Sequence, residues 1–206
     1  MARDRQSIVK MSRREGYALH PKAHKALAKR TALPGQNTTG RGRRNKPSQY
    51  AIQLREKQKV KRLYGLLERQ FRKLMEEATR RQGQSGALML QFLEQRMDNA
   101  VYRAGLAPSR RAARQLVSHG HFMLNDRRVD VPSIRLIAGD KLEARPSSKN
   151  SEYFKRLDDV SPAPSSLPGW LKVDRKKVAV SVIGIPARED AEADINEQLI
   201  VEYYSR

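Results

Sequence analysis

The sequence predicts an α+β fold: a mostly helical first domain, an inserted small module of helices and short antiparallel strands, and an extended basic N-terminal arm. Three features of its 206 residues point to this fold. Helical periodicity runs from residue 48 to about residue 104. Short β-branched runs separated by turn residues follow Gly120. The first 47 residues mix basic residues with Gly, Pro, Asn and Thr and show little apolar periodicity.

Residues 1–47 form the expected basic arm. They contain few apolar side chains, and the passage 33–44 is rich in turn residues. Because burial cannot offset the conformational entropy of such a segment, it usually orders only on its partner. We therefore expect this arm to be disordered in the free protein.

Three helices are expected after Pro47. Ser48 can cap the first, which runs to about Tyr64, because a serine hydroxyl accepts a hydrogen bond from the free N–H groups of the first turn. The second covers about residues 66–81 and carries apolar residues on one face. The third covers about residues 87–104 and ends at Gly105, a residue suited to a left-handed cap.

Residues 93–158 are expected to form the inserted module. Ser109 caps its short helix over residues 110–118, and strands are expected over 122–124, 127–131 and 141–144.

A Pro- and Ser-rich linker, residues 159–169, follows the module. Beyond it, the runs 178–183 and 198–204 are β-branched and aromatic, which is typical of strands. We expect them to return to the helices, so that residues 170–206 complete the helical domain of residues 48–92.

The charge of the chain indicates a polyanionic partner. It has 42 Lys and Arg against 22 Asp and Glu, a net charge of +20, and residues 1–62 alone carry 18 basic and 3 acidic residues. Such a balance favours nucleic acid or an anionic membrane surface. No apolar run approaches the roughly 18 to 20 residues that a membrane span needs, so nucleic acid is favoured and no membrane partner is expected. The first ten residues lack the apolar core of a secretory signal, and we expect a cytoplasmic protein.

Residues 41–62 give the first set of candidate RNA contacts. They include nine basic residues and one acid, Glu56, so a face of alternating ion pairs is a weaker interpretation than phosphate binding. The candidates here and on the next helix are Arg41, Arg43, Arg44, Lys46, Tyr50, Gln53, Arg55, Lys57, Gln58, Lys59, Arg62, Arg69 and Arg72.

The capped helix over residues 110–118 gives the second set. A helix N-terminus presents free N–H groups and a partial positive charge, and three arginines are expected to face outward around it. The turn and strand that follow could reach the backbone or base edges of RNA. The candidates are Arg110, Arg111, Arg114, Gln115, His119, His121, Asn125, Arg127 and Arg128.

Metal, cofactor and catalytic sites are not expected. The chain has no cysteine, which excludes disulfides, thiolate metal sites and cysteine nucleophiles. His20 and His24 have helical spacing, but Pro21 lies between them and no acid completes a ligand set. His119 and His121 have no acidic partner close in sequence, so an RNA contact or a structural role is favoured over a general base.

Long motifs resemble a known family in that family's order. They include residues 13–16 (Arg-Arg-Glu-Gly), 33–36 (Leu-Pro-Gly-Gln), 53–60 (Gln-Leu-Arg-Glu-Lys-Gln-Lys-Val), 64–71 (Tyr-Gly-Leu-Leu-Glu-Arg-Gln-Phe), 93–99 (Leu-Glu-Gln-Arg-Met-Asp-Asn), 114–121 (Arg-Gln-Leu-Val-Ser-His-Gly-His) and 195–205 (Ile-Asn-Glu-Gln-Leu-Ile-Val-Glu-Tyr-Tyr-Ser). Across nearly its whole length the chain resembles the family of the bacterial small-subunit ribosomal protein four. Many members bind zinc through cysteines in the N-terminal segment. Val9 and Ser12 stand where the first cysteine pair would fall, so the resemblance is to a zinc-free variant.

The resemblance implies a structural constituent of the small ribosomal subunit. Such proteins bind the five-prime domain of small-subunit rRNA at a helical junction early in assembly. They also line the mRNA entry path, contact ribosomal protein five and influence translational accuracy. The expected partners are therefore small-subunit rRNA, mRNA near the entry channel, ribosomal protein five and other small-subunit proteins.

Two rival interpretations remain at this point. One is an RNA-modifying enzyme with a similar module, such as a pseudouridine synthase, but the rest of the chain is too short for a catalytic domain with an essential Asp. The other is a free-standing regulator that binds mRNA or a stalled ribosome, which high-salt washing of small subunits would distinguish from an integral subunit.

Overall fold

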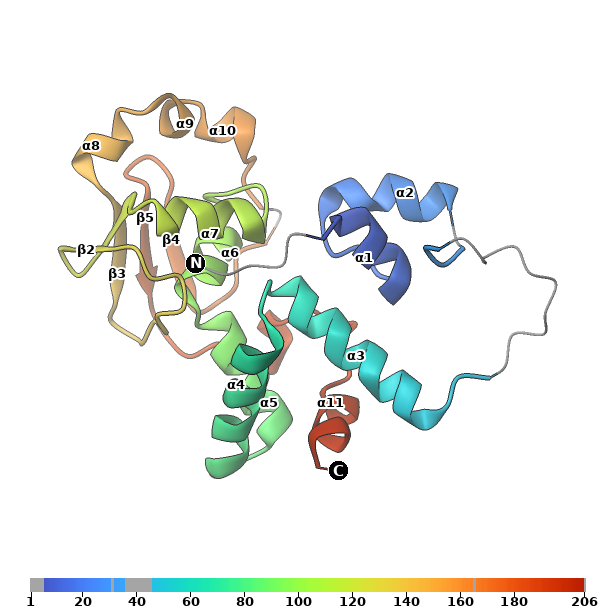
Figure 1. Cartoon of the computed structure of the whole chain (residues 1–206). Helices are drawn as coiled ribbons and strands as arrows, with labels where there is room; N and C mark the ends of the chain where they lie inside the picture. The colour runs from blue at the N-terminus through green and yellow to red at the C-terminus, as the bar shows by residue number, and fades with distance from the viewer. Residues whose placement is uncertain (1–5, 31, 36–45, 165, 206) are drawn as a thin grey trace. The chain divides into compact units, whose positions relative to one another are not determined.

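The computed structural model describes residues 6–30, 32–35, 46–164 and 166–205 and divides the chain into two compact units (Figure 1). The first unit comprises Met1–Leu88 and Asp194–Arg206, and the second comprises Met89–Ala193. Arg41, Arg43 and Arg44 lie outside the described residues.

The first unit is helical throughout its described part. Its elements are α1 (Ile8–Glu15), η1 (Pro21–Ala23), α2 (His24–Lys29), α3 (Gln49–Leu63), α4 (Glu68–Arg80), the first part of α5 (Ser85–Glu94), and α11 (Glu197–Tyr204). The predicted cap of α3 is confirmed, since the Ser48 hydroxyl accepts a hydrogen bond from the Ala51 amide at 3.3 Å. The predicted apolar face of α4 is also confirmed, because Phe71, Leu74, Met75 and Ala78 are all buried.

The expected lack of structure in the N-terminal arm is wrong for residues 8–29. Helix α1 packs against α2 and α3, and Met11, Leu19 and Ala23 are buried. Ser12 donates to the Ile8 carbonyl at 2.8 Å and accepts from the Leu19 amide at 3.3 Å. A few apolar side chains are enough here because the segment packs on a neighbouring helix.

The predicted strand over residues 198–204 is also wrong, because this segment forms α11. The Asn196 side chain accepts a hydrogen bond from the Leu199 amide at 3.4 Å and so caps the helix. As expected, the segment returns to the helical unit, where it packs against α3. Tyr203 lies 5.8 Å from Tyr50 between ring centres, so packing on α3 overrides the β propensity of the sequence.

The second unit combines helices with one antiparallel sheet. Its helical elements are the end of α5, then α6 (Met97–Arg103), α7 (Arg110–Ser118), α8 (Pro146–Lys149), α9 (Glu152–Lys155), α10 (Leu157–Val160) and η2 (Arg188–Asp190). Its strands are β1 (Phe122–Leu124), β2 (Arg127–Val129), β3 (Lys141–Ala144), β4 (Leu171–Asp174) and β5 (Ala179–Val182), in the order β2-β1-β3-β5-β4. This α+β architecture confirms the predicted fold class.

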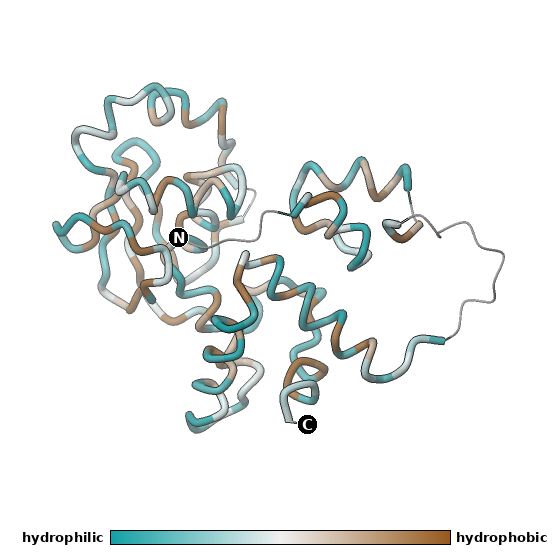
Figure 2. Tube along the Cα trace, viewed as in Figure 1, coloured by the Kyte–Doolittle hydropathy of each residue, from teal (hydrophilic) through white to brown (hydrophobic). Residues whose placement is uncertain are grey.

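The core of the second unit lies between the sheet and helices α6 and α7. Phe122, Leu142 and Val180 from the strands are fully buried with Val101 and Val117 from the two helices. Figure 2 shows hydrophobic stretches along these elements and a hydrophilic turn between β1 and β2. The residues of this turn, 125 and 126, both have positive φ, as a two-residue hairpin requires.

The predicted return of residues 178–183 to the first helices is wrong. In β5, Val180 pairs with Leu142 and Ser181 with Lys141, both on β3, and β4 then adds to the other edge of β5. The open edge of β3 offers backbone hydrogen-bond partners, which a helix surface cannot. The predicted segment 170–206 is thus divided between the two units.

The predicted single helix over residues 87–104 is broken between α5 and α6. Arg96 is extended and forms a bridge with Arg135, while the Met97 amide donates to the Ile134 carbonyl at 2.8 Å. These backbone contacts to a distant segment replace helical hydrogen bonds, so the apolar stripe continues across the break. In the described part of the chain, no helix is both long enough and apolar enough to cross a membrane.

Candidate nucleic-acid interface

An exposed polar stripe runs along α7. The Ser109 hydroxyl accepts a hydrogen bond from the Ala112 amide at 3.2 Å and starts the helix as predicted. Arg111, Gln115 and His119 follow at four-residue spacing, and all three are exposed. Residues four apart lie on one face of a helix, so these side chains form a single stripe. No ion pair joins Arg111 to another residue that the structure describes.

The turn at Gly120 brings two more arginines to the end of this stripe. Gly120 has φ +69°, and a Cβ atom built there would lie 2.9 Å from Nε of Arg128. Arg145 donates from Nη1 to the Gly120 carbonyl at 3.3 Å. Arg128 and Arg145 therefore both lie against the C-terminal end of α7, where the helix dipole favours cations. The sequence predicts Arg128 as a contact but not Arg145, because the hydrogen bond of Arg145 spans 25 residues.

The two histidines of the turn lie beside these arginines. The ring centres of His119 and His121 are 6.1 Å apart, and Nδ1 of His121 lies 3.0 Å from the Ser148 hydroxyl on α8. Burial lowers the pKa of His121, and the charges of His119 and Arg145 lower it further. Because burial is the largest cause, the neutral form of the His121 ring is favoured.

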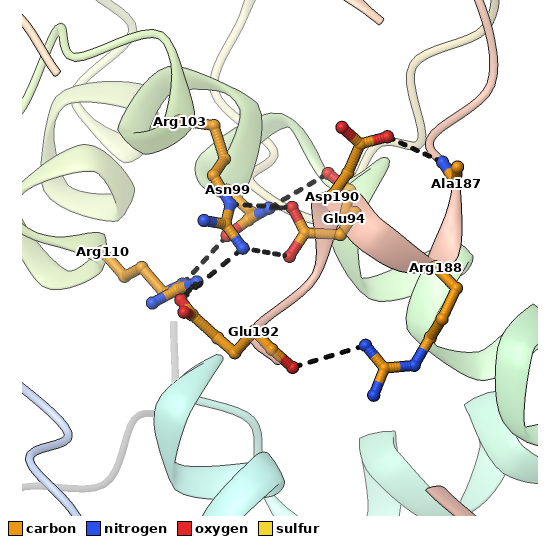
Figure 3. A network of polar contacts seen from close by, with 8 residues as sticks. All are labelled: Glu94, Asn99, Arg103, Arg110, Ala187, Arg188, Asp190 and Glu192. Carbon is orange, nitrogen blue, oxygen red and sulfur yellow. Dashed lines mark hydrogen bonds and ion pairs between the residues drawn. The ribbon is translucent and has the colours of Figure 1, made fainter. Parts of the chain in front are cut away.

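Two of the three arginines at the start of α7 point inward, so the expectation that all three face outward is wrong. Arg110 donates from Nε to the Asn99 side chain and from Nη2 to Glu192, both at 2.9 Å (Figure 3). Nη1 of Arg114 lies 3.4 Å from a carboxylate oxygen of Asp98. These acids lie 16 or more residues away in sequence. The spacing of residues within α7 therefore could not predict that the two arginines pair with them.

Behind α7 lies a buried ionic network (Figure 3). The fully buried carboxylate of Glu94 accepts two hydrogen bonds from Arg103, at 2.9 and 3.0 Å, and one from Asn99 at 2.7 Å. Burial raises the pKa of Glu192, but Arg110 and Arg103 outweigh that effect and hold it below its usual value. The network fixes α6 and α7 against the segment around Glu192.

The predicted RNA contacts on the β1–β2 hairpin are of two kinds: exposed side chains, and one side chain that bonds within the sheet. Arg127 and Arg128 are exposed and pair with no carboxylate in the part of the chain that the structure describes. Asn125 instead holds the sheet together: its amide nitrogen donates to Asp140 at 2.8 Å, and its oxygen accepts from the Lys141 amide at 2.9 Å.

The structure buries two of the predicted contacts on α3. Gln53 is 3% exposed and donates to Glu202 at 2.8 Å. Lys57 is also 3% exposed, lies 2.8 Å from Glu68, and has its Nζ 4.6 Å from the centre of the Tyr203 ring.

Other cations of α3 are paired as well. Arg55 and Arg62 both contact the buried carboxylate of Glu15, whose pKa is raised by burial despite these two charges. Lys59 lies 2.8 Å from Glu56 and donates to the Asp194 carbonyl at 2.6 Å.

The remaining predicted residues of the first unit lie at or near its surface. Lys46, Tyr50, Arg69 and Arg72 are exposed, and Arg72 pairs with Glu76 on the same helix at 3.1 Å, while Gln58 is partly buried.

The described histidines do not form a metal site with acids. His20 caps η1 by accepting a hydrogen bond from the Lys22 amide at 3.1 Å. Across the described ranges, no three or more His, Asp or Glu side chains are grouped so that they could hold a metal ion.

A helical unit and a small α+β module with an exposed polar stripe beside arginines are typical of a structural RNA-binding protein. Residues 3–94 match the family model described as ribosomal protein S4/S9 N-terminal domain, and residues 95–142 match the S4 domain. The chain is 47% identical over 207 residues to the small ribosomal subunit protein uS4 of Chlorobium phaeovibrioides, with both chains covered completely. It is equally similar, over the same share of each chain, to the protein of that name from Chloroflexus aurantiacus.

The chain belongs to the family of small ribosomal subunit protein uS4. It is therefore a structural component of the small ribosomal subunit and not an enzyme, as the sequence predicted, and the interpretation as an RNA-modifying enzyme is set aside.

Proposed function

We propose that this protein is a primary binder of small-subunit rRNA and that the α7 surface makes the contact. We define the α7 surface as Arg111, Gln115, His119, Arg128 and Arg145. The observation that carries this proposal is that three of these residues, all arginines, gather around one helix and its final turn, while the neighbouring Arg110 and Arg114 pair with the protein's own acids.

The α7 surface suits the backbone of folded RNA. Arg111, Arg128 and Arg145 can neutralise phosphates, and the release of counterions then drives binding. Gln115 and His119 are short enough to contact riboses or base edges in a shallow groove. Shape and phosphate geometry would dominate recognition over base identity.

The bound RNA is, in this proposal, a helical junction in the five-prime domain of small-subunit rRNA. Junctions bring several phosphate backbones close together, and a rigid cationic surface lowers their repulsion. By holding the junction early, the protein would nucleate assembly of the subunit. Family membership and the resemblance of the sequence motifs support this part of the proposal.

The wider roles follow from the same membership. We propose that the protein works in cytoplasmic ribosomes, lies near the mRNA entry channel, contributes to translational accuracy, and contacts ribosomal protein five and other small-subunit proteins. In the first unit, Lys46, Tyr50, Arg69 and Arg72 are the predicted RNA contacts whose exposure fits this proposal.

Binding to a five-prime domain transcript tests the proposal. The full chain should bind the folded transcript more tightly than a random RNA polymer of equal length, and affinity should fall linearly with salt on a log-log plot. Equal affinity for both RNAs would contradict it.

A second experiment separates the proposed subunit protein from a free-standing regulator. An integral protein should stay on purified small subunits through a high-salt wash, whereas release into the wash would favour the regulator.

A further inference from the structure

A second group of cations lines a cavity beside α8. This cavity, of about 240 Å³, is lined by α8, α9, α10 and the turn between β4 and β5. Since a water molecule occupies roughly 30 Å³ in the liquid, the cavity has room for a hydrated phosphate group. Its cationic lining residues are Lys149, Lys155, Arg175 and Lys176, and its acid is Asp158.

The one acid among these residues is already neutralised. Arg175 contacts Oδ1 of Asp158 from Nη2 at 2.9 Å and from Nε at 3.2 Å, and also donates to the carbonyls of Gly105 and Ser161 at 2.8 and 2.6 Å. Lys149, Lys155 and Lys176 form no ion pair within the part of the chain that the structure describes. Glu143 lies close enough to Lys149 for the lysine to lower the pKa of that carboxyl, yet it makes no ion pair with Lys149. Three lysines thus line one cavity without a direct ion pair to a carboxylate.

The turn that supplies Lys176 is held in an unusual backbone conformation. Val178 has φ +51°, a region in which a β-branched residue is a clear outlier. Hydrogen bonds hold it there: its amide donates to the Arg175 carbonyl at 3.2 Å, and its carbonyl accepts from the Ala144 amide at 3.0 Å. Such strain persists where the surroundings enforce it, and it concentrates at functional sites.

Helix α8 and the residue before it link the cavity to the turn at the end of α7. Arg145 and Ser148, before and within α8, contact Gly120 and His121 of the α7 turn. The next residue, Lys149, lines the cavity. The Gly120 turn and the lysine cavity therefore both contact the segment from Arg145 to Lys149.

We propose that the cavity between α8–α10 and the β4–β5 turn binds a backbone phosphate of the same rRNA. This inference rests on the proposed rRNA binding and adds a second, separate contact. Its ligand is a phosphate within an RNA strand, held by Lys149, Lys155 and Lys176.

The test compares two lysines of one hairpin. Lys176 lines the cavity, whereas Lys172 is exposed on β4 and does not line it. Lys176→Gln and Lys172→Gln each remove one positive charge. Two double variants, Lys155→Gln/Lys176→Gln and Lys155→Gln/Lys172→Gln, repeat the comparison in a chain that already lacks Lys155. For the cavity variants we expect weaker binding to the five-prime domain transcript and a salt slope smaller by about 1. Lys172→Gln should leave the slope unchanged.

A chemical probe gives an independent readout. The chain has no cysteine, so Lys177→Cys provides one attachment point for an iron chelate beside the cavity. Hydroxyl radicals from this position should cleave a short, defined segment of the bound transcript. The same probe at Lys172→Cys should cut that segment more weakly.

The possible failures are distinguishable. If the unaltered protein shows no preference for the transcript, the proposed function fails. If it binds the transcript but Lys176→Gln behaves as Lys172→Gln does, or the cleavage near residue 177 is absent, only the cavity proposal is overturned.

Discussion

Helices α3 and α7 look alike in sequence and differ in how their cations are used. Both begin at a serine that caps the first turn, and both are rich in basic residues. On α3, Lys57 and Arg62 pair with carboxylates from other elements of the first unit. On α7, Arg110 and Arg114 pair with carboxylates from other parts of the second unit, but Arg111 stays exposed. The density of charge along a sequence therefore does not show which cations form ion pairs with carboxylates of the same protein.

This difference predicts a division of roles. Paired, buried cations should contribute to folding stability, because the loss of one leaves its carboxylate uncompensated. The exposed arginines of the α7 surface should contribute little to stability and much to RNA affinity.

The largest effect is expected at Glu94. Glu94→Gln removes the fully buried carboxylate that holds Arg103 and Asn99, and should lower the free energy of unfolding by about 3 kcal/mol. Urea denaturation measures this loss. Glu152→Gln is the matched control, because its pair with Arg156 is exposed and should contribute less than about 1 kcal/mol. Similar losses in the two variants would contradict the assigned role of the buried network.

A smaller decrease in the free energy of unfolding is expected for a substitution of Lys57. Lys57→Gln removes a contact with Glu68 and one with the Tyr203 ring from a nearly buried side chain, at a cost of about 2 kcal/mol. Lys73→Gln, on the exposed face of α4, should change stability by no more than about 0.5 kcal/mol. If thermal unfolding ranked these two variants in the opposite order, α3 would not be the paired helix described above.

The stability of the first unit should also depend on pH through Glu68. Burial raises the pKa of this carboxyl, but hydrogen bonds from Lys57, Lys61 and Tyr204 outweigh it and lower the pKa to about 2. Because the folded pKa lies below the unfolded one, the contribution is complete above pH 4.5 and is lost as pH falls toward 2.

Comparison with Glu68→Gln isolates this contribution. After a discount for solvent screening, the unaltered protein should be about 1 kcal/mol more stable than the variant at neutral pH. The difference should disappear by about pH 2. A difference that stays constant from pH 7 to pH 2 would exclude Glu68 as its source.

Local signals predicted the helix starts and the hairpin well. Ser48 and Ser109 cap their helices as expected, and residues 125 and 126 form the turn between β1 and β2. Each of these features depends on contacts within a few residues, which the sequence displays directly.

The errors arise where distant segments decide the structure. Arg96 breaks the predicted long helix by pairing with Arg135, and the aromatic run ending at Tyr204 becomes a helix because it packs on α3. Arg110 turns inward toward Glu192, 82 residues away. At the candidate site, the sequence supplied Arg111, Gln115 and His119 but not Arg145, which reaches Gly120 only through the fold.

The salt dependence of rRNA binding for Arg111→Gln and Arg114→Gln tests most directly whether exposed cations carry RNA affinity. Both variants lose one positive charge from α7. Arg111→Gln should reduce the log-log slope by about 1 and change the free energy of unfolding by no more than about 0.5 kcal/mol. Arg114→Gln should keep the slope and lose about 1 to 2 kcal/mol of stability, because it leaves Asp98 with one fewer partner. A reduced slope for Arg114→Gln with an unchanged slope for Arg111→Gln would contradict the account.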